Sequence, residues 1–150
     1  AYKDGLQQVL LNGENVTGLL RTEEVGNMAS ASSVNKDVRL KLVELQRALA
    51  ERENVVMDGR DIGTYVLPKA NVKVYLTASS ACRAKRRYDE LTEKGETCDL
   101  AAIEADIIER DKRDMEREFA PLRQAEDATY VDSSDMTIDE VITAITDLIH

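Results

Sequence analysis

Histidine and cysteine are scarce in this chain, and no long hydrophobic run is present. Its 150 residues contain one histidine, His150, and two widely spaced cysteines, Cys82 and Cys98. A histidine-based mechanism or metal site is therefore not expected, and the cysteines are interpreted as reduced, structural thiols of a cytosolic protein. No stretch approaches the roughly 18 apolar residues that cross a membrane, and no secretion signal follows Ala1. The sequence thus predicts a cytoplasmic protein without membrane association.

The composition is that of a folded domain. With 43% hydrophobic and 33% charged residues in 150, the chain is long enough to form one domain with a core. Its formal net charge of −9 argues against general nucleic-acid binding. Local cationic clusters remain compatible with this charge, and the sequence contains such clusters.

Strand patterns alternate with helix patterns along the chain. Strands are expected at residues 8–11, 55–57, 72–77 and 128–131. Helices are expected after the N-capping residues Thr22, Asn35, Ser79 or Ser80, Asp99 and Thr137. The helix after Asn35 has an apolar stripe formed by Val38, Leu42, Leu45 and Leu49. This alternation predicts an α/β fold with a parallel sheet, right-handed crossovers and flanking helices.

The first 31 residues differ from the rest and suggest a separate subdomain. Asn12-Gly13 is a strong turn signal between short apolar and polar segments. We expect a small antiparallel piece here, with its first arm lying before Ala1.

Residues 54–64 (NVVMDGRDIGT) are the stretch most suggestive of function. A short apolar run leads directly into Asp58, Arg60 and Asp61. If the run is a buried parallel strand, these charges lie past its carboxyl end, where ligands bind in such sheets. Gly59 and Gly63 permit a sharp turn or a close approach to a bound molecule. The alternative is a polar loop whose charges pair with one another.

Two further segments concentrate arginine. On the helix after Asp99, the residues Arg110, Asp114 and Arg117 fall at i, i+4 and i+7, on one helix face. They form either an exposed salt-bridge ladder or a clamp for an anion, with the carboxylate orienting sugar hydroxyls or the arginines. The preceding helix carries a second group, which is either a solvated face or part of a lid over phosphates. That group is Arg83, Arg86 and Arg87.

Taken together, these segments resemble the bacterial cytidylate kinase family over the whole chain, in order and at family spacing. The matching motifs are residues 12–17 (NGENVT), 21–25 (RTEEV), 58–64 (DGRDIGT), 66–68 (VLP), 72–79 (VKVYLTAS), 83–87 (RAKRR), 109–117 (ERDKRDMER) and 120–122 (APL). The first two resemble the family's insert in the nucleoside-monophosphate-binding region. The resemblance implies a P-loop nucleoside-monophosphate-kinase fold and transfer of the terminal phosphate of ATP to CMP or dCMP, with Mg²⁺.

The resemblance also implies roles for individual residues. Ser30, Arg39 and Asp61 would read the cytosine, and Arg60 and Arg117 would hold the phosphate of CMP. Arg110 and Asp114 would hold the sugar. Arg86 and Arg87 would belong to the lid over ATP, and Asp58 would contact Mg²⁺ through water. The chemistry agrees, since a carboxylate such as Asp61 accepts from the cytosine amine while Arg39 donates to ring acceptors. Phosphoryl transfer needs positioning and charge stabilisation rather than a histidine.

One family feature is missing from the sequence. The chain contains no GxxxxGK[ST], the phosphate-cradling motif. It resembles the C-terminal two-thirds of such a kinase, without the first two sheet strands, and we expect the 150 residues alone to be inactive. Residues 1–53 would belong to the nucleoside-monophosphate-binding region, 54–82 to the core, 83–118 to the lid and its helices, and 119–150 to the last core strand and helix. We expect the complete protein to be a monomer.

Three other interpretations remain open. The chain is a non-catalytic nucleotide- or partner-binding fragment, a kinase for UMP or AMP, or a structural protein without a ligand. The Arg39 and Asp61 pair argues against UMP and AMP.

Overall fold

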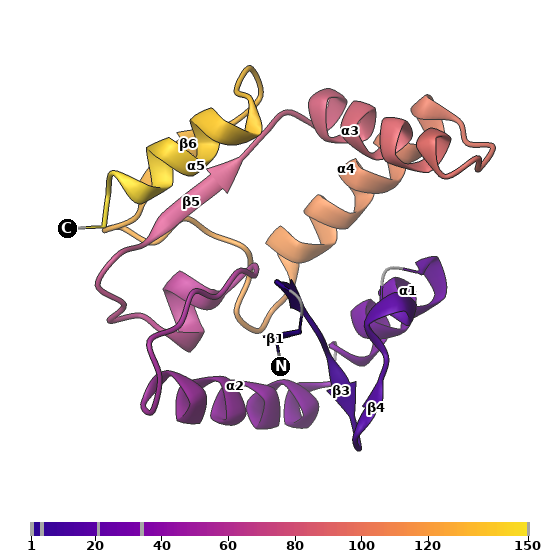
Figure 1. Ribbon diagram of the computed structural model, residues 1–150. Helices are drawn as coiled ribbons and strands as arrows, with labels where there is room; N and C mark the ends of the chain where they lie inside the picture. Colours follow the sequence, from indigo (N-terminus) through magenta and orange to yellow (C-terminus); the bar gives the residue numbers. More distant parts are fainter. Residues whose placement is uncertain (1, 4, 21, 34, 150) are drawn as a thin grey trace. The chain divides into compact units, whose positions relative to one another are not determined.

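The computed structural model describes residues 2–3, 5–20, 22–33 and 35–149, without the side chains of residues 2, 3, 23, 27 and 30. The chain divides into two compact units, Ala1–Arg52 and Glu53–His150, and Figure 1 shows the elements of each. Within the described residues, no helix combines the length and apolarity needed to span a bilayer.

The first unit begins with two small hairpins. They are formed by the strands β1 (Tyr2–Lys3), β2 (Leu6–Gln7), β3 (Leu10–Leu11) and β4 (Glu14–Asn15). Asn12 and Gly13 have φ angles of 51° and 88° between β3 and β4, as a tight two-residue hairpin turn requires. The predicted turn is confirmed. This turn pairs β3 with β4, and the expected first arm before Ala1 stays a prediction.

Two helices follow the 3₁₀ turn η1 (Thr17–Leu19), and both begin at the predicted caps. Thr22 caps α1 (Glu23–Ser32), and Asn35 accepts from the Asp37 and Val38 amides at the start of α2 (Lys36–Ala50). The predicted stripe of α2, however, is exposed by 40–54%, whereas Val43 is buried. A unit of about 50 residues has too little chain to cover a full helix face.

The second unit contains the parallel sheet. Its elements are η2 (Ile62–Val66), β5 (Val74–Thr77), α3 (Ser80–Glu93), α4 (Leu100–Glu116), β6 (Thr129–Asp132) and α5 (Ile138–Thr146). β5 and β6 run parallel in a register that places Val74 opposite Thr129 and Thr77 opposite Asp132. The α/β class with a parallel sheet is therefore confirmed.

Local signals fix the ends of the helices in this unit. Ser79 and Asp99 cap α3 and α4, and Gly95 ends α3 with φ 79°. The amides of Gly95 and Glu96 bond back to Thr92 and Leu91 in a Schellman arrangement. Thr137 and Glu140 form the predicted capping box of α5, and this hydrogen bonding lowers the pKa of Glu140. Residues with strong local preferences were thus predicted correctly.

The predicted strand at residues 55–57 is absent. Residues 54–58 carry no regular structure, and Val56 is 96% exposed. A strand needs a partner for its backbone groups, and no described segment pairs with these residues. The next segment instead forms the π-turn η2, in which the Val66 and Leu67 amides bond to the Asp61 and Ile62 carbonyls.

Packing and one buried cation hold η2 in place. Val66 is 2% exposed, and the Tyr65 ring meets Phe119 edge-on at 4.9 Å. The Lys73 ammonium, on a side chain only 6% exposed, donates to the Pro68 carbonyl at 2.5 Å and to Asp127 at 2.6 Å. This contact lowers the pKa of Asp127. The loop before η2 therefore leads into a turn held by packing and by the contacts of Lys73.

Candidate functional site

Four charged residues from two separate segments meet in the second unit. Nε of Arg60 donates to Oδ2 of Asp114 at 3.2 Å. Nη2 of Arg117 lies 3.7 Å from Oδ2 of Asp61, and its Nη1 lies 4.0 Å from Oδ1 of Asp114. Arg60, Asp61, Asp114 and Arg117 are called the four-charge cluster below. The structure thus joins the loop before η2 to the end of α4.

Helix termination brings Arg117 into this cluster. The sequence suggested that Arg110, Asp114 and Arg117 share one face of a helix, but α4 ends at Glu116 and Arg117 is extended, with φ −60° and ψ 140°. Nε of Arg117 donates to the Ala120 carbonyl at 2.7 Å, which folds the segment back. Arg110 stays on the helix, and its exposed side chain has no hydrogen bond or ion pair to another described residue. The predicted trio is therefore divided.

The exposed fraction of the side chains in the cluster increases from Asp61 to Arg60. The Asp61 side chain is 12% exposed, Asp114 and Arg117 are about 20% exposed, and Arg60 is 43% exposed. The pair separations of 3.2–4.0 Å exceed the 2.7–2.9 Å of a strong charge-assisted bond. Two positive and two negative groups balance one another, and the guanidinium of Arg60 faces solvent. This arrangement can receive an anion at its open side.

Gly59 shapes the loop by close packing rather than by a positive φ. A Cβ at this position would lie 3.0 Å from Cγ1 of Ile62. Any side chain here would push against the first residue of η2, next to Arg60 and Asp61. The sequence suggested a sharp turn or a close approach to a bound molecule, whereas the neighbour in the structure is a side chain of the protein itself.

The second arginine group separates into three different environments. Arg83 forms a two-point pair with Asp111 of α4. Arg86 donates to the Ser133 carbonyl at 2.6 Å, just past the carboxyl end of β6, while Arg87 pairs with Glu90 of its own helix at 2.9 Å. The three arginines therefore do not form one cationic face.

The remaining predicted residues are not brought into the cluster. Asp58 is exposed and has no hydrogen bond or ion pair with another described residue. The side chain of Ser30 lies outside the described residues, and Arg39 is half-buried in α2 of the first unit. The prediction that Ser30 and Arg39 share a pocket with Asp61 stays a prediction.

Sequence reasoning missed two charged residues that form long-range ion pairs in the second unit. Asp111 falls between the motif residues Arg110 and Asp114, and Lys73 precedes β5 in an apolar segment. No local pattern distinguishes these two charges from solvated ones. Their partners, Arg83 and Asp127, lie 28 and 54 positions away.

Comparison with known proteins identifies the family. A sequence model of the family described as cytidylate kinase matches residues 2–150. The chain belongs to the cytidylate kinase family. Membership agrees with the parallel α/β architecture of the second unit and implies the P-loop nucleoside-monophosphate-kinase fold.

Curated relatives from several bacteria resemble the chain along nearly its full length. A cytidylate kinase of Caldicellulosiruptor saccharolyticus is 51% identical over 97% of the chain and 65% of its own length. Those of Lactobacillus johnsonii and Bacillus subtilis are 49% and 46% identical over 99% of the chain, and over 64% and 66% of their own lengths. The chain thus spans about two-thirds of the length of the cytidylate kinases that it matches.

Proposed function

We propose that the natural protein carrying this sequence transfers the terminal phosphate of ATP to CMP or dCMP, giving CDP or dCDP. The chain would supply the acceptor-nucleotide side of that reaction. The observation that carries this proposal is the four-charge cluster, which joins Arg60 and Arg117 through the carboxylates of Asp61 and Asp114. Membership of the cytidylate kinase family supports the same reaction.

The phosphate of CMP is assigned to Arg60 and Arg117. A nucleoside monophosphate carries close to two negative charges at neutral pH, which two guanidinium groups balance. In the structure the carboxylates hold both arginines close to one another without a strong charge-assisted bond. A phosphate would replace the longer contacts with bidentate ones, so the arginines are positioned before the nucleotide arrives.

The base and the sugar would be recognised by carboxylates and their neighbours. Asp61 accepts from the exocyclic amine of cytosine, where uracil offers a carbonyl and would be repelled. Arg39 and Ser30 would complete the base contacts. Asp114 and the exposed Arg110 would bind the ribose hydroxyls. Because 2′-hydroxyl contacts are only part of this set, both CMP and dCMP are expected substrates.

Arg86 and Arg87 are assigned to the lid over the ATP phosphates. In the structure Arg86 is bonded to Ser133 and Arg87 to Glu90. Both contacts would exchange for phosphate oxygens during closure. This exchange costs little for Arg87, because its pair with Glu90 is largely solvated.

Magnesium would enter with ATP rather than occupy a protein cage. The described residues hold no cluster of three or more potential metal ligands. The exposed carboxylate of Asp58 fits a contact through metal-bound water, because Mg²⁺ keeps several waters and takes its other ligands from phosphates. The ion neutralises charge on the phosphates of ATP. Asp58 would orient one of its waters.

A coupled assay of ADP release tests the proposal. The natural protein should release ADP with CMP and dCMP at least about tenfold faster than with UMP or AMP. The 150-residue chain alone should show no CMP-dependent release, because its sequence holds no GxxxxGK[ST]. CMP-dependent ADP release by the 150-residue chain would contradict the expectation that this chain is inactive alone. A preference for UMP or AMP would sink the substrate assignment.

The runner-up function is a non-catalytic nucleotide- or partner-binding fragment. Calorimetry with CMP on the 150-residue chain examines it, with Arg110→Ala and Asp61→Ala as site variants and Arg113→Ala as the matched control. Arg113 lies on the same helix, is 61% exposed and faces Glu109 at 3.8 Å. CMP binding by the chain, without phosphate transfer by the natural protein, would favour the runner-up.

We place the protein in the cytoplasm as a monomer that binds neither nucleic acid nor membranes.

A further inference from the structure

All three nitrogens of the Arg83 guanidinium donate hydrogen bonds within the protein. Its Nε donates to the Ala78 carbonyl at 3.0 Å, and Nη1 and Nη2 donate to the two oxygens of Asp111 at 3.0 and 2.5 Å. The contact with Asp111 raises the pKa of Arg83. A guanidinium whose fork and Nε are both engaged has no geometry left for a bidentate phosphate contact. Arg83 therefore offers no bidentate phosphate contact in this arrangement.

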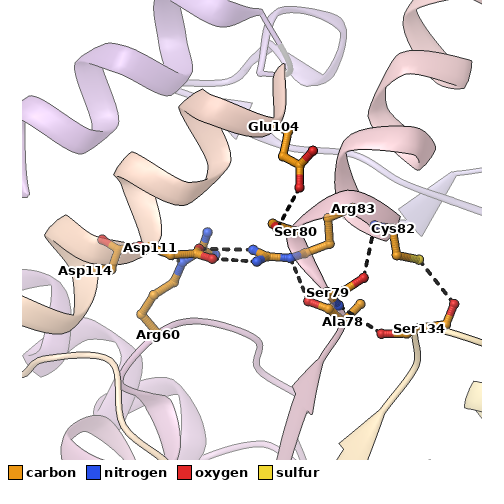
Figure 2. A network of polar contacts seen from close by, with 10 residues as sticks. All are labelled: Arg60, Ala78, Ser79, Ser80, Cys82, Arg83, Glu104, Asp111, Asp114 and Ser134. Atoms are coloured by element: carbon orange, nitrogen blue, oxygen red, sulfur yellow. Dashed lines mark hydrogen bonds and ion pairs between the residues drawn. The ribbon is translucent and has the colours of Figure 1, made fainter. Parts of the chain in front are cut away.

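The contacts of Arg83 join three elements of the second unit. Ala78 follows the last residue of β5 and is 7% exposed, Arg83 lies in the first turn of α3, and Asp111 lies in α4. Figure 2 shows the Arg83 side chain extending from α3 between Ala78 and Asp111. Ser80 adds a second link from α3 to α4, donating to Glu104 at 2.9 Å. Together these bonds fix α4 relative to the carboxyl end of β5.

Asp111 lies close to the four-charge cluster. It precedes Asp114 by three positions in α4, which is less than one turn or roughly 4.5 Å along the axis. Asp114 holds Arg60 and faces Arg117. Any displacement of α4 therefore moves the carboxylate that places both arginines. Displacements of about 1 Å are enough to impair a phosphoryl-transfer site.

Arg83 also controls the charge next to the cluster. Asp111 unpaired would add a negative charge beside Asp114, where a phosphate is to bind. The guanidinium of Arg83 neutralises it through two short bonds. Without this pairing, Asp111 would compete with the phosphate for Arg60 and repel the nucleotide.

From these contacts we infer that Arg83, acting through Asp111, is a positioning residue for the acceptor-phosphate cluster. It serves the CMP side of the site, although it lies in the arginine-rich helix that the sequence associates with ATP. The inference rests on the proposed function, because the cluster is assigned there to the phosphate of CMP. Arg83 and Asp111 would thus support the residues that bind CMP without touching the nucleotide themselves.

Steady-state kinetics of the natural protein separate the two nucleotide sites. Arg83→Met, Arg83→Lys and Asp111→Asn are measured for KM of CMP, KM of ATP and kcat. In Arg83→Met and Asp111→Asn the KM for CMP should rise about tenfold, while the KM for ATP stays within about twofold of the wild type. Arg83→Lys keeps the charge but loses the fork, so its KM for CMP should fall between those of the wild type and Arg83→Met.

The matched control is Lys85→Met, on the same helix as Arg83. Lys85 is exposed, pairs with Asp89 four residues along α3 and lies 5.9 Å from the centre of the Tyr88 ring on the same helix. This variant should leave both KM values unchanged. Asp111→Asn retains the shape of the carboxylate and reports on the same pair if Arg83→Met fails to fold.

Three results would overturn the inference. A raised KM for ATP with an unchanged KM for CMP would place Arg83 at the donor site. Reduced melting temperatures with unchanged KM values would make the pair a stabilising contact and nothing more. If the wild type releases no ADP with CMP, the proposed function has failed, and calorimetric affinity for CMP becomes the measurement. Equal affinities of wild type and Arg83→Met would then reject the positioning role as well.

Discussion

Two arginine–aspartate contacts in the second unit differ in how completely the arginine is bonded. Arg83 makes three hydrogen bonds at 2.5–3.0 Å, two to Asp111 and one to a backbone carbonyl. Arg60 makes one bond to a described residue, to Asp114 at 3.2 Å, although it too lies beside α4. Arg60 is 43% exposed and Arg83 is 37% exposed, so burial does not separate them.

The difference lies in the donors that remain. A guanidinium has five N–H groups in a fixed fork. Both Nη atoms of Arg83 donate to Asp111. The Nη atoms of Arg60 have no described partner and face solvent. Free donors, and not exposure, therefore separate the arginine that we propose as a phosphate ligand from the one that we propose as a positioning residue. The comparison predicts a larger loss of CMP turnover when Arg60 is removed than when Arg83 is removed.

Replacement of Arg60 should give the largest effect. Arg60→Met in the natural protein should lower kcat/KM for CMP about a thousandfold, because a guanidinium on the transferring phosphate acts mainly in the transition state. The melting temperature should stay close to that of the wild type, since only one hydrogen bond is lost. Arg113→Met is the control and should retain full activity. A loss below tenfold would erase the distinction drawn between Arg60 and Arg83.

Replacement of Asp61 should give an intermediate effect, on selectivity. Asp61→Asn presents an amide, which can rotate to face either cytosine or uracil. The ratio of kcat/KM for CMP to that for UMP should fall about 10- to 100-fold, most of it through weaker use of CMP. The measurement is a competition between CMP and UMP, with Glu109→Gln as an exposed control. An unchanged ratio would assign cytosine recognition elsewhere and leave Asp61 as a partner of Arg117.

The smallest effect is expected at Glu90, whose contacts are solvated. Lys94 and Arg87 hold the pKa of Glu90 at about 2, below its ordinary value of 4.5. A depressed carboxylate contributes stability that is fully present above pH 4.5 and is lost as the pH falls toward 2. Glu90→Gln should therefore lower the melting temperature slightly at pH 7, and the difference should narrow below pH 4.5.

Melting curves from pH 7 to pH 3 check this expectation, with Glu93→Gln as the control. Glu93 is an exposed residue of the same helix, and its variant should track the wild type throughout. A difference that grows on acidification would contradict the sign of the Glu90 contribution. Because these ion pairs are exposed, salt should also reduce the difference at pH 7.

Local features could be read from the sequence, and non-local ones could not. Thr22, Asn35, Ser79, Asp99 and Thr137 cap the helices they were predicted to cap. Each cap depends on residues within three positions, so the chain encodes it directly. Residues 55–57 have strong strand preference but form no strand, because a strand depends on a neighbour elsewhere.

The candidate site was predictable in its composition but not in its connections. The motif residues Arg60, Asp61, Asp114 and Arg117 were identified together, and the structure joins them across 54 positions. Helical spacing wrongly placed Arg117 on the helix face of Arg110 and Asp114, because α4 ends one residue before Arg117. The role of Asp111 depends on a partner in another helix, and helical periodicity carries no information about such a partner.

By itself, the sequence determined the turns, the helix caps and, through its motifs, membership of the cytidylate kinase family. The tertiary structure decided which of several similar arginines has its guanidinium fork bonded within the protein and which has a fork without a described partner. That choice requires knowing which carboxylates and carbonyls lie within about 3 Å of each guanidinium. Such distances arise only when α3, α4 and the end of β5 pack together, and no single segment of the chain specifies them.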